Sequence, residues 1–344
     1  MRRALILGGG GARGSYQAGM LLELVGNQGL DFSILRGVSV GALNAAFLAQ
    51  APLGSNPEES ISNLKAQVGA LNDLWTHAIQ GNYSVYAERP GGLAGLALGA
   101  DSLYTIEPLR KLISEKISLE KLRSSGRDFA VGTVSLVSGK YLEWTPAEDD
   151  FLDKLIASAA IPVIFPYVDT GDNILVDGGV RRITPLSLVF KANPDEIYAL
   201  LTSRMILQDD CAWPESYPQW DDNWLGTKVS GLVVLKRTVE ILTDEIYLND
   251  LSGALDWNAV AEKIVALGKA AAGLELPSGV AETVAGVLKA ISSVNKRYVP
   301  IHILAPQKWY GKDNSSTDFD PGYISAAIDH GRDIAANPNL WIRR

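Results

Sequence analysis

The sequence predicts an α/β fold with a central, mostly parallel sheet, helices on both faces and a helical insertion or cap. Short apolar runs suited to buried strands alternate along the chain with longer segments of helical periodicity. The connecting turns are short, and no Pro/Ser-rich linker divides the 344 residues. A chain of this length that is 47% hydrophobic can bury a large core.

The first elements follow one another with little between them. Residues 4–7 are an apolar run typical of a buried strand, and this run opens directly into the glycine-rich stretch 8–14. A helix is expected over 15–26, because its apolar residues fall close to one face. A second strand over 32–38 and a helix over 42–49 come next, separated by a turn of small residues.

The rest of the chain continues this alternation. Strands are predicted over 128–136, 140–144, 173–176, 196–202 and 299–305, and helices over 57–80, 105–117, 151–160 and from Pro321. Between the last two strands, helical periodicity is expected over 224–249, 257–272 and 280–297. The expected organisation is therefore a core over 1–205, a helical insertion or cap over 206–297, and a strand and helix over 298–344 that complete the core.

Charge and cysteine content bound the class of protein. A formal net charge of −8 argues against a nucleic-acid binder, which needs a basic face. The single cysteine, Cys211, has no partner for an internal disulfide, which favours a reducing compartment. The apolar run after Met1-Arg2-Arg3 is too short for a signal peptide, and no run of about 18 apolar residues occurs. We therefore expect a cytoplasmic protein that is free to associate transiently with a membrane surface.

The segment Gly37-Val38-Ser39-Val40-Gly41 stands between the strand over 32–38 and the helix over 42–49. Glycines two residues to either side of Ser39 allow a tight bend that holds the hydroxyl at its tip, above the first amides of the helix. Ser39 is therefore a candidate nucleophile. The pattern alone is equally compatible with a serine that caps a helix.

The glycine-rich stretch after the first strand predicts an anion site, because it exposes backbone N–H groups at the positive end of a helix. The anion is either a phosphate or the oxyanion of a reacting ester. Gly9 to Gly14 fits G-x-G-x-x-G, but a dinucleotide site needs an acidic residue at the end of the second strand. Asp31 instead precedes that strand, which favours an oxyanion loop.

Four motifs together resemble those of the patatin-like phospholipase family, and they follow that family's order over roughly residues 4 to 200. They are Gly9-Gly10-Gly11-Ala12-Arg13-Gly14, Gly37-Val38-Ser39-Val40-Gly41, Ser158-Ala159-Ala160-Ile161-Pro162-Val163-Ile164-Phe165-Pro166 and Asp177-Gly178-Gly179. Each is modestly specific alone, and jointly they are highly specific. The resemblance implies a three-layer α/β/α architecture and a substrate that is an acyl ester of a lipid, as for a phospholipase A or lysophospholipase.

The resemblance also makes Asp177 the expected partner of Ser39, in a catalytic dyad that works through an acyl-enzyme. Amides of Gly10 and Gly11, with Arg13 nearby, are expected to hold the oxyanion. Gly9, Gly14, Gly37, Gly41, Gly178 and Gly179 are the remaining motif residues. No metal, organic cofactor or nucleic acid is expected, and the expected partner is a lipid or another acyl ester.

Two alternatives remain open. A Ser-His-Asp triad would use Ser39, Asp177 and one of the late histidines, His302 on a predicted strand or His330 in the helix after Pro321. A non-enzymatic nucleotide- or lipid-binding protein would use the glycine loop for phosphate, and it leaves Ser39 and Asp177 without a role.

Overall fold

The computed structural model describes residues 1–203, 206–207, 214–215, 231–272, 277–292, 298–307 and 316–343. Cys211 and the start of the helix predicted from Trp224 lie outside these residues. In the described part of the chain, the main sheet has nine strands in the order β13-β12-β9-β1-β2-β5-β8-β7, with β6 paired to β5.

The middle of this sheet is parallel. Five strands run in the same direction, namely β12 (Ile301–Leu304), β9 (Glu196–Leu200), β1 (Arg3–Leu7), β2 (Ile34–Val38) and β5 (Asp128–Ser135). Antiparallel strands complete both edges: β13 (Ile342–Arg343), β6 (Tyr141–Trp144), β8 (Ile174–Asp177) and β7 (Val168–Asp169). Two short pairs stand apart, β3 (Ala87–Glu88) with β4 (Tyr104–Thr105) and β10 (Ile206–Leu207) with β11 (Pro214–Glu215).

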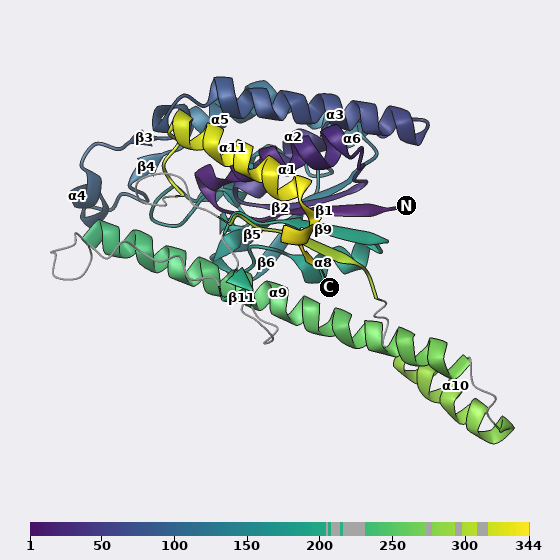
Figure 1. The fold of residues 1–344 in the computed structure, drawn as a ribbon. Helices are drawn as coiled ribbons and strands as arrows, with labels where there is room; N and C mark the ends of the chain where they lie inside the picture. Colours follow the sequence, from purple (N-terminus) through teal and green to yellow (C-terminus); the bar gives the residue numbers. More distant parts are fainter. Residues whose placement is uncertain are drawn as a thin grey trace.

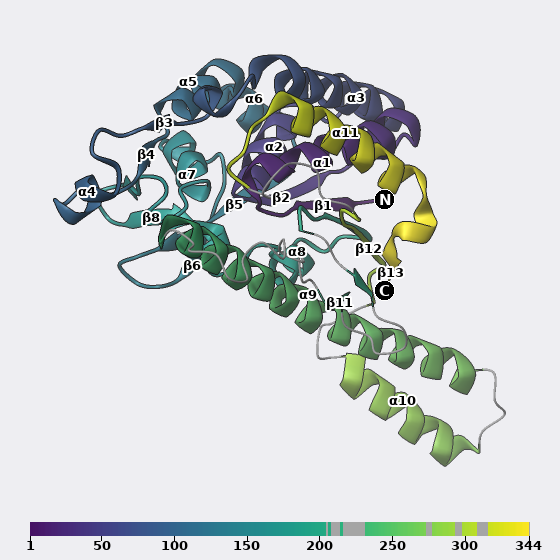
Figure 2. The same cartoon turned by 60° about the vertical axis from the view of Figure 1, so that its left-hand side comes forward.

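Helices cover both faces of the sheet (Figures 1 and 2). One face carries α1 (Gly14–Leu21), α2 (Val40–Ala49), α3 (Pro57–Asp73), α5 (Glu107–Lys116), α6 (Leu119–Ser124), α7 (Phe151–Ser158, labelled in Figure 2) and α11 (Pro321–Ala336). The opposite face carries α8 (Leu186–Val189) and the long α9 (Gly231–Ala272), whose far end pairs with α10 (Ser278–Ser292) away from the sheet. The short α4 (Gly92–Ala97) lies beyond the β3–β4 pair. The predicted α/β/α architecture is confirmed.

Strand β1 shows why the sheet needs both layers. Successive side chains of a strand point to opposite faces. Leu5 and Leu7 therefore join the core beneath α1 and α2, whereas Ala4 and Ile6 join a second core that includes residues of α8 and α9. All four side chains are fully buried. A strand that is apolar on both faces is the expected signature of such a parallel sheet.

The helices differ from the prediction in their regularity. The segments expected over 15–26 and 57–80 end in π-helical turns, η2 (Leu22–Asn27) and η3 (Leu74–Ala78). The helical periodicity expected over 224–249 and 257–272 is confirmed in the described residues, where both ranges belong to one helix, α9, that continues through the residues between them. Leu251, Ala254 and Leu255 lie at helical spacing and are buried in the second core, so packing holds this stretch helical despite Gly253.

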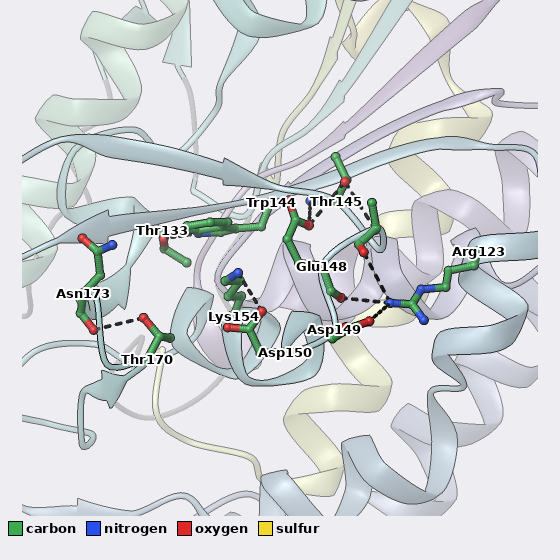
Figure 3. A network of polar contacts seen from close by, with 11 residues as sticks. Arg123, Thr133, Trp144, Thr145, Glu148, Asp149, Asp150, Lys154, Thr170 and Asn173 are labelled. Carbon is green, nitrogen blue, oxygen red and sulfur yellow. Dashed lines mark hydrogen bonds and ion pairs between the residues drawn. The ribbon is translucent and has the colours of Figure 1, made fainter.

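A polar network braces β6 against α7 (Figure 3). Trp144 Nε1 donates to Thr133 Oγ1 at 2.7 Å, and the Lys154 ammonium lies 4.0 Å from the centre of a Trp144 ring. Lys154 also bonds Asp150 at 2.7 Å, so its buried charge is paired. Thr133 is the register partner of Asp177, and the network therefore supports the sheet directly beside that residue.

Within the described ranges, no helix is both long and apolar enough to cross a membrane.

Candidate active site

Ser39 forms a sharp turn between β2 and α2. Its backbone has φ 56° and ψ −132°, a conformation that side-chain-bearing residues rarely adopt and that is typical of a nucleophile elbow. The flanking glycines are required by close approach. A Cβ on Gly41 would lie 2.1 Å from the Leu7 carbonyl oxygen, and one on Gly37 would lie 2.3 Å from the Gly41 carbonyl oxygen. The turn therefore holds the Ser39 hydroxyl at the carboxyl ends of β1 and β2.

Ser158 fixes this turn from behind. Its buried hydroxyl accepts the Ser39 N–H at 3.1 Å and donates to the Gly132 carbonyl at 2.7 Å. The serine at the end of α7 therefore ties the elbow to the neighbouring strand β5. The sequence placed Ser158 in a family motif without assigning it a role, and the structure supplies this contact.

The glycine loop lies against the elbow. A Cβ on Gly9 would come within 2.9 Å of the Ser39 Cβ, and one on Gly14 within 2.4 Å of a Val40 methyl. Gly10 and Gly11 have φ 151° and 56°, which turn the chain into the short helix η1 (Gly11–Arg13). Among the described residues, no acceptor bonds the N–H of Gly10 or Gly11. Two backbone donors are therefore available beside Ser39.

A buried side-chain network joins this loop to the elbow helix. The Gln17 amide donates to the carbonyls of Gly8 and Leu200 at 2.8 and 3.0 Å, and Gln17 Oε1 accepts from Asn44. Asn44 Oδ1 in turn accepts the Trp75 indole N–H at 3.1 Å. Both side-chain amides have hydrogen-bond partners for their nitrogen and their oxygen. The network therefore makes the site rigid and leaves none of these buried polar atoms without a hydrogen bond.

Asp177 reaches Ser39 from an antiparallel strand. Ser39 follows β2, which is parallel to β5, whereas β8, which ends at Asp177, runs antiparallel to β5. The two still meet, because Val38 pairs with Gly132 and Asp177 pairs with the next residue, Thr133. Strand β8 thus pairs with the part of β5 that extends beyond the end of β2, and it ends beside the last residue of β2.

The Asp177 turn is tightly packed and hydrogen-bonded. The Asp177 N–H donates to the Ala160 carbonyl at 2.9 Å, and Asp177 Oδ1 accepts the Gly179 N–H at 2.7 Å. A Cβ on Gly178 would lie 2.5 Å from the Gly132 carbonyl oxygen, so the turn needs glycine there. Gly178 and Gly179 begin the short helix η5 (Gly178–Val180).

Burial raises the pKa of Asp177 from 3.8 to about 7, although hydrogen bonds from the Ser39 side chain and the Gly179 N–H lower it. Both side chains are almost inaccessible, with 4% of Asp177 and 6% of Ser39 exposed. The structure therefore brings Ser39 and Asp177 within hydrogen-bonding reach, in surroundings that make the carboxylate a much stronger base than usual.

Two cavities meet at Ser39. The first, of about 910 Å³ including space open to solvent, is lined by Ser39, Asp177, Gly10, Gly11, Arg13 and Gly179, with Ile183, Leu242 and Ile246 among the apolar residues. The second, of about 830 Å³, has an almost wholly apolar surface from α2, α3 and α5. We call them the polar cavity and the apolar cavity. The predicted loop residue Arg13 is buried and lines the polar cavity only.

A segment far along the chain closes over both cavities. Ser316 lines both, and its carbonyl oxygen accepts the Ala12 N–H at 2.7 Å. Phe319 stacks on Trp75 with ring centres 6.4 Å apart, and the Thr317 carbonyl accepts the Tyr86 hydroxyl. No local pattern predicts this contact, because the segment lies almost 280 residues after Ser39.

The histidines lie elsewhere. His302 Nε2 hydrogen-bonds Glu196 at 2.8 Å, at the amino end of the strands, and His330 accepts the Gln307 N–H at 3.0 Å. His77 is exposed beside Asp73. None of the three lines either cavity. The geometry therefore gives no support to a Ser-His-Asp triad.

The described residues contain no group of three or more His, Cys, Asp or Glu side chains placed to hold a metal ion.

The chain matches the model of one protein family, Patatin-like phospholipase, over residues 5–190. Among known proteins, Probable lipid hydrolase 463L of Invertebrate iridescent virus 6 is 27% identical over 195 residues, which make up 55% of this chain and 63% of that protein. The chain thus spans less than two thirds of that relative's length. Among solved structures, VipD from Legionella pneumophila gives a TM-score of 0.37 at 12% identity, covering 100% of this chain and 68% of that one. A structural similarity with so low a TM-score supports no conclusion about this chain.

Proposed function

Because this chain belongs to the patatin-like phospholipase family, we propose that it is a lipid acyl hydrolase with Ser39 as nucleophile and Asp177 as base. The observation that carries the proposal is the meeting of these two side chains at the junction of the polar and apolar cavities. The name of the viral relative, a probable lipid hydrolase, supports the same substrate class.

In the proposed reaction, Ser39 Oγ attacks the carbonyl carbon of an ester while its proton passes to Asp177. The carbonyl oxygen becomes an oxyanion, and it is stabilised by the N–H groups of Gly10 and Gly11, which no acceptor among the described residues occupies. When this intermediate collapses, the bond to the leaving alcohol breaks and the alcohol takes the proton from Asp177. Ser39 is then acylated.

Water completes the cycle. It attacks the acyl carbonyl and gives a proton to Asp177, and the second intermediate collapses to a free carboxylic acid and a reprotonated Ser39. Asp177 suits both steps, because a pKa of about 7 lets it accept a proton near neutral pH and give it back. An ordinary aspartate, with a pKa of 3.8, would be a weak base there.

In this proposal each of the two cavities binds a different part of the substrate. The apolar cavity begins at Ser39 and continues along α2 past Leu43 to Phe47, which a helical rise of 1.5 Å per residue puts about 12 Å further on. Such a pocket fits an acyl chain, whose burial is favourable by about 0.8 kcal/mol per methylene. The polar cavity holds Arg13 and the loop amides, and it receives the leaving group.

A serine-directed fluorophosphonate tests this function. The reagent should label Ser39 in the wild-type protein, and Ser39→Ala should lose both labelling and about 10⁴-fold or more of ester turnover. Ser33→Ala is a matched control, because this serine precedes the same strand and lines neither cavity. His302→Ala and His330→Ala should retain turnover.

Labelling at another serine, or normal turnover by Ser39→Ala, would refute the proposed nucleophile. A protein that binds lipid or nucleotide equally well with and without Ser39 and hydrolyses nothing would instead be a binding protein.

A further inference from the structure

We propose that Asp250 of α9 is a positioning residue that keeps the active-site loops in register. It lies outside residues 5–190, the part of the chain that matches the family model. The inference rests on the proposed function, because the loops in question carry Asp177 and the oxyanion donors.

The contact is a carboxylate that accepts two consecutive backbone donors. Asp250 Oδ2 accepts the N–H of Ile183 at 2.8 Å and that of Thr184 at 3.1 Å. Both residues are buried, and their N–H groups precede the short helix α8. Without the carboxylate these buried donors would lack a partner, which is costly. The loop after the Asp177 turn is therefore held by α9.

Ile183 passes this restraint on to the site. Its side chain lines the polar cavity together with Ser39 and Asp177. A Cβ on Gly9 would lie 3.1 Å from Ile183 Cγ1, and one on Gly179 would lie 3.6 Å from its terminal carbon. The isoleucine is thus wedged between the glycine loop and the Asp177 turn, and a shift of its backbone would change the spacing of both.

Helix α9 is firmly seated where Asp250 lies. Leu251, Ala254 and Leu255 are buried against the second core, and Asn258 Oδ1 accepts the Val299 N–H at 3.0 Å. By contrast, Val260 on the opposite side of the same helix is 46% exposed. One face of α9 is therefore fixed to the core, and Asp250 stands at the end of this fixed face nearest the cavity wall.

Asp250 does not line either cavity, so its role is positional and not chemical. The charged and titratable groups around it are Arg182 on the same loop and the buried Tyr141 hydroxyl of β6. Burial raises the pKa of Asp250 to about 6, and the two N–H groups and Arg182 oppose this rise. At neutral pH the carboxylate is mostly ionised and is held by hydrogen bonds of the stronger, charge-assisted kind.

Three substitutions separate position from charge. Asp250→Ala removes the acceptor and should slow fluorophosphonate labelling of Ser39 by about 10- to 100-fold, because small displacements of catalytic groups have effects of that size. Asp250→Asn keeps an oxygen that accepts both N–H groups and should stay within about threefold of wild type. Asp250→Glu keeps the charge but moves it by one methylene, and it should be slower than Asp250→Asn. Asp256→Ala, an exposed residue of the same helix, should change nothing.

Hydrogen exchange supplies a reading that does not depend on activity. Peptides covering 178–186 and 8–14 should exchange faster in Asp250→Ala than in wild type, Asp250→Asn or Asp256→Ala. Equal exchange and labelling in Asp250→Ala and wild type would overturn the inference, as would an Asp250→Glu variant faster than Asp250→Asn. This second comparison decides the matter even if Asp250→Ala does not fold. If wild-type protein is not labelled at Ser39, the proposed function fails, while the exchange comparison still tests the role of Asp250.

Discussion

The two cavities that meet at Ser39 share that residue, Gly11, Ile161 and Ser316, and differ in almost everything else. The apolar cavity is walled by side chains of α2, α3 and α5 that also belong to the main hydrophobic core. The polar cavity is walled by loops and by α9, and it contains a buried carboxylate and backbone donors without partners among the described residues.

The difference separates what stabilises the fold from what the proposed chemistry requires. Residues around the apolar cavity contribute to folding by burying apolar surface. The groups at the polar cavity oppose folding: Asp177 is buried close to an apolar core, and Ser39 has a strained backbone. Asp177→Asn and Ser39→Gly should therefore lower activity and raise stability, whereas substitutions on the apolar side should change substrate preference.

The largest effect is expected for Asp177→Asn. The amide still accepts the Gly179 N–H, so the turn should persist, but it cannot take a proton from Ser39. Ester turnover should fall by about 10⁴-fold, the scale seen when a serine nucleophile loses its base. Initial rates with a soluble ester, at matched protein concentration, measure this loss, and a decrease of less than about tenfold would contradict Asp177 as the base.

The same variant should be more stable than wild type above neutral pH. The folded pKa of Asp177, about 7, lies above its ordinary value of 3.8, so between these values the folded state binds a proton that the unfolded state lacks. Stability from this group therefore falls as pH rises through that window, by at most about 1.4 kcal/mol per pH unit. Denaturant unfolding at pH 5 and pH 8 should show that the stability of the Asn variant, relative to wild type, is higher at pH 8 than at pH 5.

The activity of the wild-type protein should fall below pH 7, because Asp177 then becomes protonated and can no longer act as the base.

On the apolar side, Leu112→Trp should change chain-length preference. Leu112 is half-buried on α5 and lines the apolar cavity. A larger ring there should fill the end of the pocket and lower kcat/KM for long acyl chains by about 10- to 100-fold, since each lost methylene contact is worth about 0.8 kcal/mol. Esters of short acids should be hydrolysed as before.

The control for this variant is Leu119→Trp, because Leu119 packs on the same core without lining the cavity. A series of p-nitrophenyl esters from acetate to palmitate measures the profile for both variants. An equal loss at every chain length in Leu112→Trp would place the acyl chain elsewhere.

The sequence predicted most of the sheet and the segments that carry the site. The alternation of apolar runs with helical stretches gave β1, β2, β5, β6, β8, β9 and β12 to within about two residues of their observed ends. It also identified Ser39, Asp177 and the glycine loop, which the structure brings to one cavity, while their chemical roles stay predictions. Short local motifs are predictable because turn geometry depends on nearby residues.

The parts that escaped prediction depend on distant contacts. Strand direction is not encoded in a four-residue strand, so the antiparallel course of β8 could not be read from Ile174–Asp177. Asp250 is one acidic residue in a long helix, and only its two backbone partners distinguish it from Asp256. The contact between Ser316 and Ala12 is a hydrogen bond between backbone groups, so no side chain in the sequence indicates it. Such contacts arise from tertiary packing and leave no local pattern.

The smallest effect expected on the polar side is a gain in stability from Ser39→Gly. Glycine adopts φ 56° and ψ −132° without the steric cost that serine carries, which is about 1–3 kcal/mol for a strained residue. Part of this gain is offset by the greater freedom of glycine in the unfolded chain, about 0.5–1 kcal/mol. The free energy of unfolding of Ser39→Gly should therefore be about 1 kcal/mol higher than that of Ser39→Ala, because the alanine keeps the strained backbone. Neither variant has a nucleophile. The control is Asn193→Gly. Asn193 has the same φ of 56°, but it lies in the left-handed region that asparagine tolerates, so its replacement by glycine should raise the free energy of unfolding by less. If Ser39→Gly and Ser39→Ala unfold at the same denaturant concentration, the elbow stores no strain, and the stability cost on the polar side comes from Asp177 alone.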